Sequence, residues 1–316
     1  MSEHVLVTGG AGFIGSHVAD TFVAAGYAVT VLDNLSSGRR ENVPGAATFV
    51  EADIRSPEAK ELLSSGDFTV VDHHAAQMDV RVSVADPEFD AQVNIMGLLN
   101  LLEGGRAGGV RRFVFASSGG VVYGESDDLP HREDARKLPV SPYGVSKLSS
   151  EFYLASYAQL HGLETVSLRY ANVYGPRQSP HGEAGVVSIF GSRALRGDPI
   201  TVFGDGSQTR DYVYVGDVAR ANLEAATCTL AAIHTIDDVA YNVGTSIETS
   251  VNDLAALLLD AAGAKITIEN APARPGELQR SSVDVSRAAH EWNWHPEVPL
   301  AVGLKQTYDW IVEEAR

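Results

Sequence analysis

The sequence predicts an α/β fold in which a doubly wound parallel sheet is joined to a smaller C-terminal α/β lobe. Over the first half of the 316 residues, short apolar segments alternate with stretches long enough for helices. This alternation is typical of parallel strands with crossover helices. A glycine-rich turn follows the first apolar segment, and glycine and proline become frequent beyond about residue 175.

The first strand and the helix after it are the segment around which the sheet is organised. Residues 5–7 are apolar and fit a buried strand. The next apolar positions have helical spacing and are Ile14, Val18 and Phe22. Between them, Gly9 would allow a tight turn, Gly12 the approach of a pyrophosphate and Gly15 close helix packing. Because a helix N-terminus attracts anions, we interpret the turn as a Rossmann-type phosphate site; the alternative is an ordinary loop.

Five more strands and a division of the chain follow from the same patterns. The predicted strands are Val29–Leu32, Thr48–Val50, Phe68–Asp72, Arg112–Ala116 and Val166–Tyr170. Later, Ser250 is a helix N-cap, Gly263 ends that helix, and residues 302–312 form a terminal amphipathic helix. We therefore predict a nucleotide-binding domain over residues 1–175 and a substrate-binding lobe mainly over 176–316, with the chain crossing between them.

Composition limits the class of partner. The net charge of −17 argues against nucleic acid, because phosphate binding needs clustered lysine and arginine; it fits either a salt-rich habitat or an ordinary acidic surface. No apolar run approaches the ~18 residues needed to cross a membrane, and the first predicted strand leaves no room for a signal peptide. The single cysteine, Cys228, fits a reducing compartment. We expect a cytoplasmic protein that binds neither nucleic acid nor a membrane.

A carboxylate stands where a ribose-binding group is expected. Asp33 ends the second predicted strand, 18 residues after Gly15, and can accept hydrogen bonds from a ribose diol. It would repel a ribose phosphate, which favours NAD, although the Arg39–Arg40 pair nearby leaves NADP open. The alternative is a simple turn residue. The Asp53–Ile54 pair closes the third strand and is placed to reach the adenine.

A tyrosine and a lysine share one face of a predicted helix. Tyr143 and Lys147 are four positions apart. A lysine ammonium beside a phenol favours the phenolate and lowers a pKa that is normally ~10, which provides a general base near neutrality. Alone, such a pair is usually a surface contact. Ser117 and Ser118, at the end of the fifth predicted strand, strengthen the functional interpretation, because either hydroxyl could bond a substrate oxygen beside the phenol.

Further segments occur in a recognisable order: Arg169–Arg177 (RYANVYGPR), Gly182–Phe190, Thr209–Val215 and Arg274–Glu277. With the glycine turn, residues 33–38 and the Tyr143–Lys147 pair, they resemble the extended short-chain dehydrogenase/reductase family. Within it, the chain is most similar to the UDP-glucose (UDP-galactose) 4-epimerases, over nearly its whole length. The resemblance implies an NAD-dependent isomerase of UDP-glucose and UDP-galactose, with the N-acetylated pair left open.

The resemblance also implies a mechanism. Tyr143 would take the proton of the sugar 4′-hydroxyl while hydride leaves C4′ for the nicotinamide. The 4-keto sugar would rotate about its diphosphate linkage, and hydride would return to its opposite face. Lys147 would hold the nicotinamide ribose and tune Tyr143, and Ser118 would bond the same sugar oxygen. NAD would be regenerated in each cycle and stay bound.

The same resemblance assigns two sets of binding residues. The cofactor set is Gly9, Gly12, Phe13, Ile14, Gly15, Asp33, Asn34, Ser37, Gly38, Asp53, Ile54, Ala75, Ala76, Gln77, Asn94, Tyr143, Lys147 and Tyr170. The substrate set is Ser118, Tyr143, Asn172, Val187, Arg210, Tyr212, Arg274, Glu277 and Ser281. Asn172, Arg210 and Arg274 would bind the diphosphate, which suits guanidinium geometry, and Glu277 the uridine ribose. The alternative for each arginine is a surface salt bridge.

Three departures from close relatives matter. The Gly119–Gly120 pair after Ser118 provides no acid to expel a 6′-hydroxyl, which disfavours a 4,6-dehydratase. His73 and His74 occupy a segment where some relatives carry a lysine. Because adjacent strand residues point to opposite faces, we expect a packed pair and no metal. Ser281 is small where relatives have a residue bounding the sugar pocket, so an N-acetyl group would fit.

Rival functions remain at this stage. A UDP-uronate 4-epimerase, or another sugar-nucleotide dehydratase or reductase, is the first alternative. Ser179 follows the Pro176–Gln178 segment where uronate-specific relatives offer an additional arginine, which favours neutral hexoses. A non-catalytic NAD-sensing protein is the second alternative, although such proteins commonly lose the Tyr143–Lys147 pair.

A homodimer is expected from the same resemblance. The helices predicted around Pro87–Gly104 and Tyr143–His161 would pair across a two-fold axis, as in the family's dimers. Helical periodicity does not distinguish a dimer face from a core face.

Overall fold

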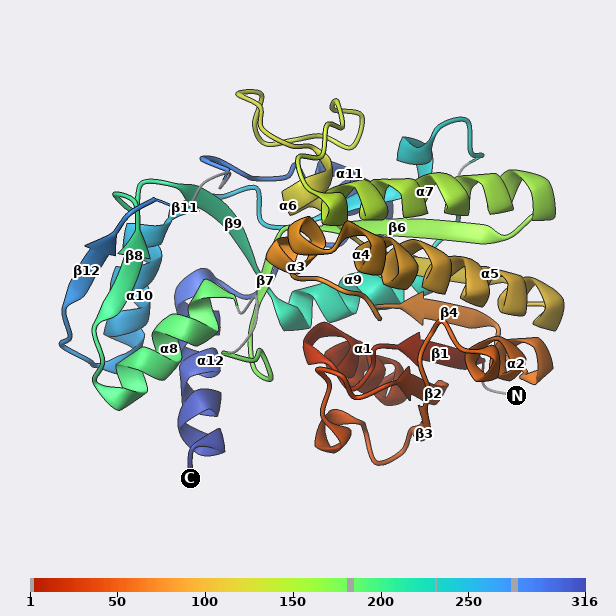
Figure 1. Cartoon of the computed structure of the whole chain (residues 1–316), viewed down its shortest axis with the longest axis horizontal. Coiled ribbons are helices and arrows are strands. Elements are labelled where there is room, and N and C mark those ends of the chain that lie inside the picture. The colour runs from red at the N-terminus through yellow and green to blue at the C-terminus, as the bar shows by residue number, and fades with distance from the viewer. Residues whose placement is uncertain (1–2, 181–184, 231, 274–277) are drawn as a thin grey trace.

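The computed structural model describes residues 3–180, 185–230, 232–273 and 278–316. A large sheet with helices on both faces occupies one side of the molecule, and a smaller lobe lies beside it (Figure 1). Within these described ranges, no helix combines the length and apolar character required to cross a membrane.

The large sheet is parallel throughout its seven described strands. Their spatial order is β10-β6-β5-β4-β1-β2-β3. The strand bounds are His4–Thr8 (β1), Ala28–Asp33 (β2), Thr48–Glu51 (β3), Val70–His73 (β4), Arg112–Ser118 (β5), Glu164–Tyr170 (β6) and Ala240–Val243 (β10). All six strands expected from the sequence form, and the doubly wound, Rossmann-type sheet is confirmed.

The seventh strand was not predicted. β10 comes from the later part of the chain and pairs with β6 at the edge of the large sheet. The chain therefore returns to the large sheet after entering the smaller lobe. The division at residue 175 stays a prediction.

Both faces of the large sheet are buried, which explains its continuous apolar strands. Val5 and Val7 of β1 pack into one core with α1, whereas Leu6 faces a second core that includes Phe113 and Leu154. Helices α1 and α9 pack together, as do α2 and α5 (Figure 1). Bounds are Phe13–Ala24 (α1), Pro57–Ser65 (α2), Val80–Ala85 (α3), Pro87–Ala91 (α4), Gly97–Gly108 (α5), Gly119–Val122 (α6), Pro142–His161 (α7), Val215–Thr227 (α9) and Ser286–Trp292 (α11). A π-helical segment, Gln92–Met96 (η2), joins α4 to α5, and short 3₁₀ turns cover Arg40–Asn42 (η1) and Ile236–Val239 (η3).

The smaller lobe packs three helices against two short sheets (Figure 1). Its strands are Asn172–Tyr174 (β7), Ile200–Phe203 (β8), Thr209–Tyr214 (β9), Glu248–Ser250 (β11) and Ile268–Ala271 (β12), and its helices are Val186–Arg196 (α8), Val251–Ala262 (α10) and Leu300–Glu314 (α12). The predicted start of α10 is confirmed, because the Ser250 side chain accepts from the N–H of Asp253. Its predicted end is confirmed too, at Gly263 in the left-handed region.

One buried carboxylate joins the two parts of the molecule. Asp211 on β9 accepts from the N–H groups of Thr245 (2.8 Å) and Ser246 (3.0 Å), in the loop after β10. Its own N–H donates to the carbonyl of Ser281 at 3.0 Å. The smaller lobe is therefore held near the carboxyl ends of the large sheet's strands, where ligands bind in open α/β sheets.

Candidate active site

The glycine turn has the geometry that the sequence predicts. Gly9 lies at φ +69°, and a Cβ there would lie 2.6 Å from the backbone nitrogen of Ala75. A Cβ at Gly15 would lie 2.3 Å from the carbonyl oxygen of Gly9, so β1 and α1 pack closely only with glycine there. Gly12 is the N-cap of α1, which has no side-chain cap, and a Cβ at Gly12 would lie 3.1 Å from the carbonyl oxygen of Gly9. This cradle fits the phosphates of a dinucleotide.

The Asp33 carboxylate is held beside this turn. One oxygen accepts from the N–H of Ala11 (3.0 Å) and the other from the N–H of Leu35 (2.8 Å). Gly38 packs closely against the same carboxylate, because a Cβ at Gly38 would lie 3.0 Å from an Asp33 oxygen. The acidic group expected for a ribose therefore lies at the edge of the glycine turn.

Asn34 and Asp53, both in the predicted cofactor set, are brought together across two loops. The Asn34 amide donates to Asp53 at 3.1 Å, and Arg55 binds the same carboxylate at 2.7 and 2.9 Å. The Arg55 hydrogen bonds lower the pKa of Asp53 to about 2. Asp53 is therefore an anionic acceptor at the start of the loop after β3, while Ile54 is buried behind it.

The loop after β4 is fixed by a buried amide. The N–H of Gln77 donates to Asn94 at 2.9 Å, and Asn94 donates to the Gln77 carbonyl at 2.8 Å. Buried Asp90 accepts from both side chains and, with its other oxygen, from Ser146 on α7 at 2.6 Å. Asn94 thus supports the Ala75–Gln77 loop, and Asp90 connects this loop to the helix that carries Tyr143.

Lys147 is buried and points toward the end of β5. Its Nζ donates to the carbonyl of Ala116 at 2.7 Å and lies 5.7 Å from the centre of the Tyr143 ring. Burial lowers the pKa of Lys147 to about 8, against the opposing charges of Asp90 and Glu151. Tyr143 and Lys147 therefore lie on one face of α7, as predicted. The pKa of Lys147 lies well below that of an ordinary lysine.

The two candidate serines have different surroundings. Ser117 is buried, and its hydroxyl donates to Glu151 at 2.5 Å. Ser118 is partly exposed, and both its hydroxyl and the side-chain oxygen of Asn172 lie within 4.0 Å of the position of a Cβ at Gly120. This arrangement favours Ser118 as the residue facing a substrate, and its role stays a prediction.

Two adjacent histidines pack on opposite faces of the sheet, as the sequence predicts. His73 contacts the hydroxyl of Thr8 at 2.7 Å. His74 lies 2.8 Å from Asp72 and stacks on the ring of Tyr170, at 6.3 Å between ring centres. The sequence did not lead us to expect Asp72 as the buried partner of His74. The signal that could have revealed it is a carboxylate within an otherwise apolar strand.

The remaining predicted cofactor residues lie at or beyond the carboxyl ends of the strands of the large sheet. Tyr170 is buried, and its hydroxyl bonds Asn222 of α9 at 2.9 Å. The others lie at the start of α1, after β2 and after β4, and they are Phe13, Ile14, Ser37 and Ala76.

Apart from Ser118 and Tyr143, the described residues of the predicted substrate set lie in or beside the smaller lobe. Asn172 on β7 is exposed and pairs with Tyr212 on β9. Arg210, two residues before Tyr212, donates to the carbonyl of Thr209 at 2.8 Å. The side chains of Val187 and Tyr212 are buried in the core of this lobe, and Ser281 is buried beside β9. Arg274 and Glu277 lie outside the described residues, so the roles of this set stay predictions.

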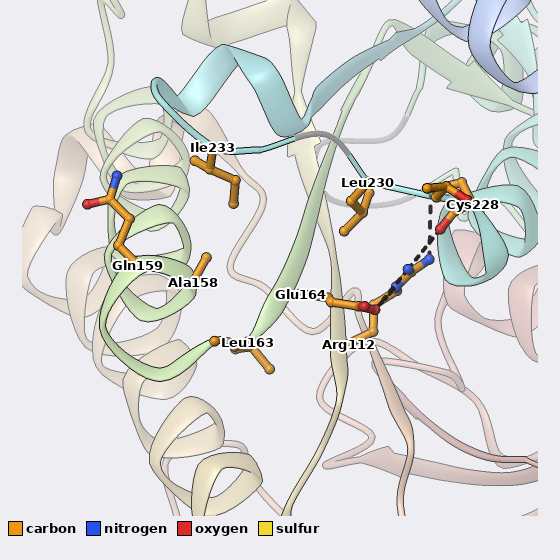
Figure 2. A pocket seen from close by; sticks show the side chains of 10 residues that line it. Arg112, Ala158, Gln159, Leu163, Glu164, Cys228, Leu230 and Ile233 are labelled. Carbon is orange, nitrogen blue, oxygen red and sulfur yellow. Dashed lines mark hydrogen bonds and ion pairs between the residues drawn. The ribbon is translucent and has the colours of Figure 1, made fainter.

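A separate cavity of about 580 Å³ lies at the amino ends of β5 and β6, whereas the candidate site lies at the carboxyl ends of the strands (Figure 2). Arg112 and Glu164, the first residues of β5 and β6, line it with Cys228 and Leu230. The Arg112 guanidinium donates to the carbonyls of Ala225 (2.9 Å) and Cys228 (2.8 Å), which caps the end of α9. Burial raises the pKa of the Cys228 thiol. The cavity is therefore distinct from the candidate active site.

Comparison with known proteins identifies the family. The model of the NAD dependent epimerase/dehydratase family matches residues 5–244. The chain belongs to this family. It is 44% identical to the UDP-glucose 4-epimerase of Mycolicibacterium smegmatis over 97% of each chain. This similarity confirms the predicted resemblance to the extended short-chain dehydrogenase/reductases and shows an NAD-dependent epimerase, an isomerase.

Two solved structures resemble this epimerase over its whole length. The UDP-glucose 4-epimerase of Thermotoga maritima with UDP-glucose has a TM-score of 0.94 and 45% identity, covering 99% of this chain and 100% of that chain. The UDP-N-acetylglucosamine 4-epimerase of Methanobrevibacter ruminantium, in complex with UDP-N-acetylmuramic acid, has a TM-score of 0.92 and 33% identity, covering 99% and 100%.

The pKa of Lys147 predicts an alkaline limit on turnover. The predicted support of a Tyr143 phenolate requires a charged Lys147, so it would be present below about pH 8 and lost as pH rises above that value. We expect turnover at saturating substrate to fall as pH rises through about 8. Turnover that stays constant well above that pH would contradict the assignment. Substrate-free circular dichroism over the same range controls for unfolding.

Proposed function

We propose that this epimerase interconverts UDP-glucose and UDP-galactose through a 4-keto intermediate. The observation that carries the proposal is the buried Lys147 beside Tyr143, bonded to the strand segment that leads to Ser118. In this proposal, a base (Tyr143), a cation that tunes it (Lys147) and a hydroxyl (Ser118) would act together at the carboxyl end of β5. UDP-glucose 4-epimerases similar over the whole length, from M. smegmatis and T. maritima, support this substrate.

The glycine turn, Asp33 and the Ala75–Gln77 loop would hold NAD. When bound, NAD accepts a hydride from the sugar carbon and returns it. Asp33 would accept hydrogen bonds from the adenosine ribose, and the N-terminus of α1 would face the pyrophosphate. Lys147 would bind the nicotinamide ribose with the protons not used by the Ala116 carbonyl.

Tyr143 would act as the general base and general acid of the reaction. Its phenolate takes the proton of the 4′-hydroxyl, and the Ser118 hydroxyl bonds the same oxygen. Lys147 stabilises the phenolate electrostatically. The same proton returns from Tyr143 when the 4-keto sugar is reduced on its other face, so the reaction is balanced without an external acid.

We propose that the smaller lobe binds the diphosphate while the keto sugar rotates. Alternation along β9 places Arg210 and Tyr212 on one face and Asp211 on the other. Asp211 is fixed by Thr245 and Ser246, which holds β9 in place for Arg210. Arg210, exposed Asn172 and Arg274 would bind the diphosphate, and Glu277 would bind the uridine ribose. A firm hold on the nucleotide lets the keto sugar rotate without leaving.

Removal of the Tyr143 hydroxyl should abolish most turnover. Tyr143→Phe should lower kcat for UDP-galactose by about 10²- to 10⁴-fold, the usual contribution of a general base. Binding of UDP, measured by calorimetry, should be unchanged. Tyr153→Phe, at a partly exposed position on the same helix, is the matched control and should retain full turnover. Near-normal turnover of Tyr143→Phe would refute the mechanism.

We further propose that the sugar pocket admits an N-acetyl group. The Ser281 side chain is small, and the backbone carbonyl of Ser281 accepts a hydrogen bond from the N–H of Asp211 on β9. The related enzyme of M. ruminantium acts on UDP-N-acetylglucosamine, which supports the proposal.

A bulky side chain at position 281 should separate the two substrate pairs. We expect Ser281→Tyr to suppress kcat/KM for UDP-N-acetylglucosamine and to spare UDP-galactose, because the phenol would fill the space for the acetamide. Ser281→Ala should turn over both. Equal losses on both substrates would contradict the pocket assignment. UDP-glucuronate in the same panel tests the uronate alternative.

We also propose a homodimer formed by α7 and the helix that contains α4, η2 and α5. These helices lie side by side in Figure 1. Both expose apolar side chains to solvent. Phe152 is 57% exposed and Met96 is 58% exposed. Pairing two copies would cover these side chains.

A charge on this face should separate the subunits. Phe152→Glu should elute as a monomer in size-exclusion chromatography with light scattering, whereas the unaltered chain should be a dimer. Ile247→Glu, at an exposed apolar position just before β11 and outside these helices, should leave the mass unchanged. A monomeric unaltered chain would refute the proposed dimer.

A further inference from the structure

A buried carboxylate links the catalytic helix to the end of β5. Glu151 lies one helical turn after Lys147 on α7, and its side chain is 1% exposed. It accepts a hydrogen bond from the Ser117 hydroxyl at 2.5 Å. It also accepts from the Arg169 guanidinium at 2.6 and 3.0 Å.

Two successive turns of α7 therefore hold two successive residues of β5. Lys147 binds the carbonyl of Ala116, and Glu151 binds the side chain of Ser117. Ser118 is the next residue and ends the strand. Because Tyr143 is on the same helix, the two contacts define where Ser118 lies relative to Tyr143.

Arg169 makes this attachment rigid. Its side chain is fully buried and also donates to the hydroxyl of Tyr123 (3.1 Å) and the carbonyl of Glu133 (2.8 Å). Asp237 lies 2.9 Å from the same guanidinium. A carboxylate held by a guanidinium with this many partners has little rotational freedom, and its acceptor oxygen stays aimed at Ser117.

We propose that Glu151 is a positioning residue that acts through Ser117 to set the distance between the Ser118 hydroxyl and the Tyr143 phenol. The inference rests on the proposed function, in which both groups bind the same sugar oxygen. Small displacements of catalytic groups have large effects on rate, because the reacting atoms must be aligned before the chemical step. A purely structural buried ion pair would affect folding without changing turnover.

The test removes the hydrogen bond between Ser117 and Glu151 and keeps the ion pair between Glu151 and Arg169. Ser117→Ala leaves Glu151 paired with Arg169, so no buried charge loses its partner. We expect kcat for UDP-galactose to fall about 10- to 100-fold, with KM, UDP affinity and NAD content unchanged. The matched control is Tyr157→Phe, which removes a 2.7 Å bond from the same helix to Glu103. It should retain full kcat.

Hydrogen exchange provides a second readout that does not depend on turnover. In nucleotide-free protein, amides of residues 117–120 should exchange faster in Ser117→Ala than in the unaltered chain, and Tyr157→Phe should leave them unchanged. Unchanged kcat in Ser117→Ala, or an equal loss in Tyr157→Phe, would overturn the inference. If the unaltered chain does not epimerise UDP-galactose, the proposed function fails, and unchanged exchange in Ser117→Ala would then refute the positioning role separately.

Discussion

The parallel register of the large sheet is the constraint on which the candidate site depends. Thr8 of β1 is beside His73 of β4, and Ser118 of β5 is beside Tyr170 of β6. Because all these strands run in one direction, their carboxyl ends and the loops that follow meet at the same edge. The glycine turn, the loop after β4 and Ser118 are thereby brought together, although the first and the last are more than a hundred residues apart in the sequence.

Buried charges then fix these loops in place. A buried ionic group is costly unless it is paired and hydrogen-bonded. Glu151 is paired with Arg169, and Asp211 accepts from three backbone N–H groups in addition to a hydroxyl. Each one holds a neighbour of a proposed functional residue: Glu151 holds the strand before Ser118, and Asp211 lies next to Arg210. We infer that these buried carboxylates position residues of the candidate site as well as stabilising the fold.

Much of the fold was predictable because its signals are local. Apolar strands, helical spacing and caps such as Ser250 depend on residues close together in the sequence. β10 was missed because its four residues, AYNV, are short and not framed by a strand–helix alternation. Its place in the sheet depends on pairing with β6, about 70 residues earlier, which no local pattern reveals.

The amino-acid sequence by itself determined the glycine turn, the carboxylate that ends β2 and the Tyr143–Lys147 spacing, because each follows from backbone geometry within one or two elements. Tertiary structure decided which serine faces outward, because that depends on which face of β5 meets Glu151 of α7. It also decided that Arg169, the first residue of the RYANVYGPR segment, is buried against Glu151. Such choices depend on side chains that only packing brings within hydrogen-bond distance.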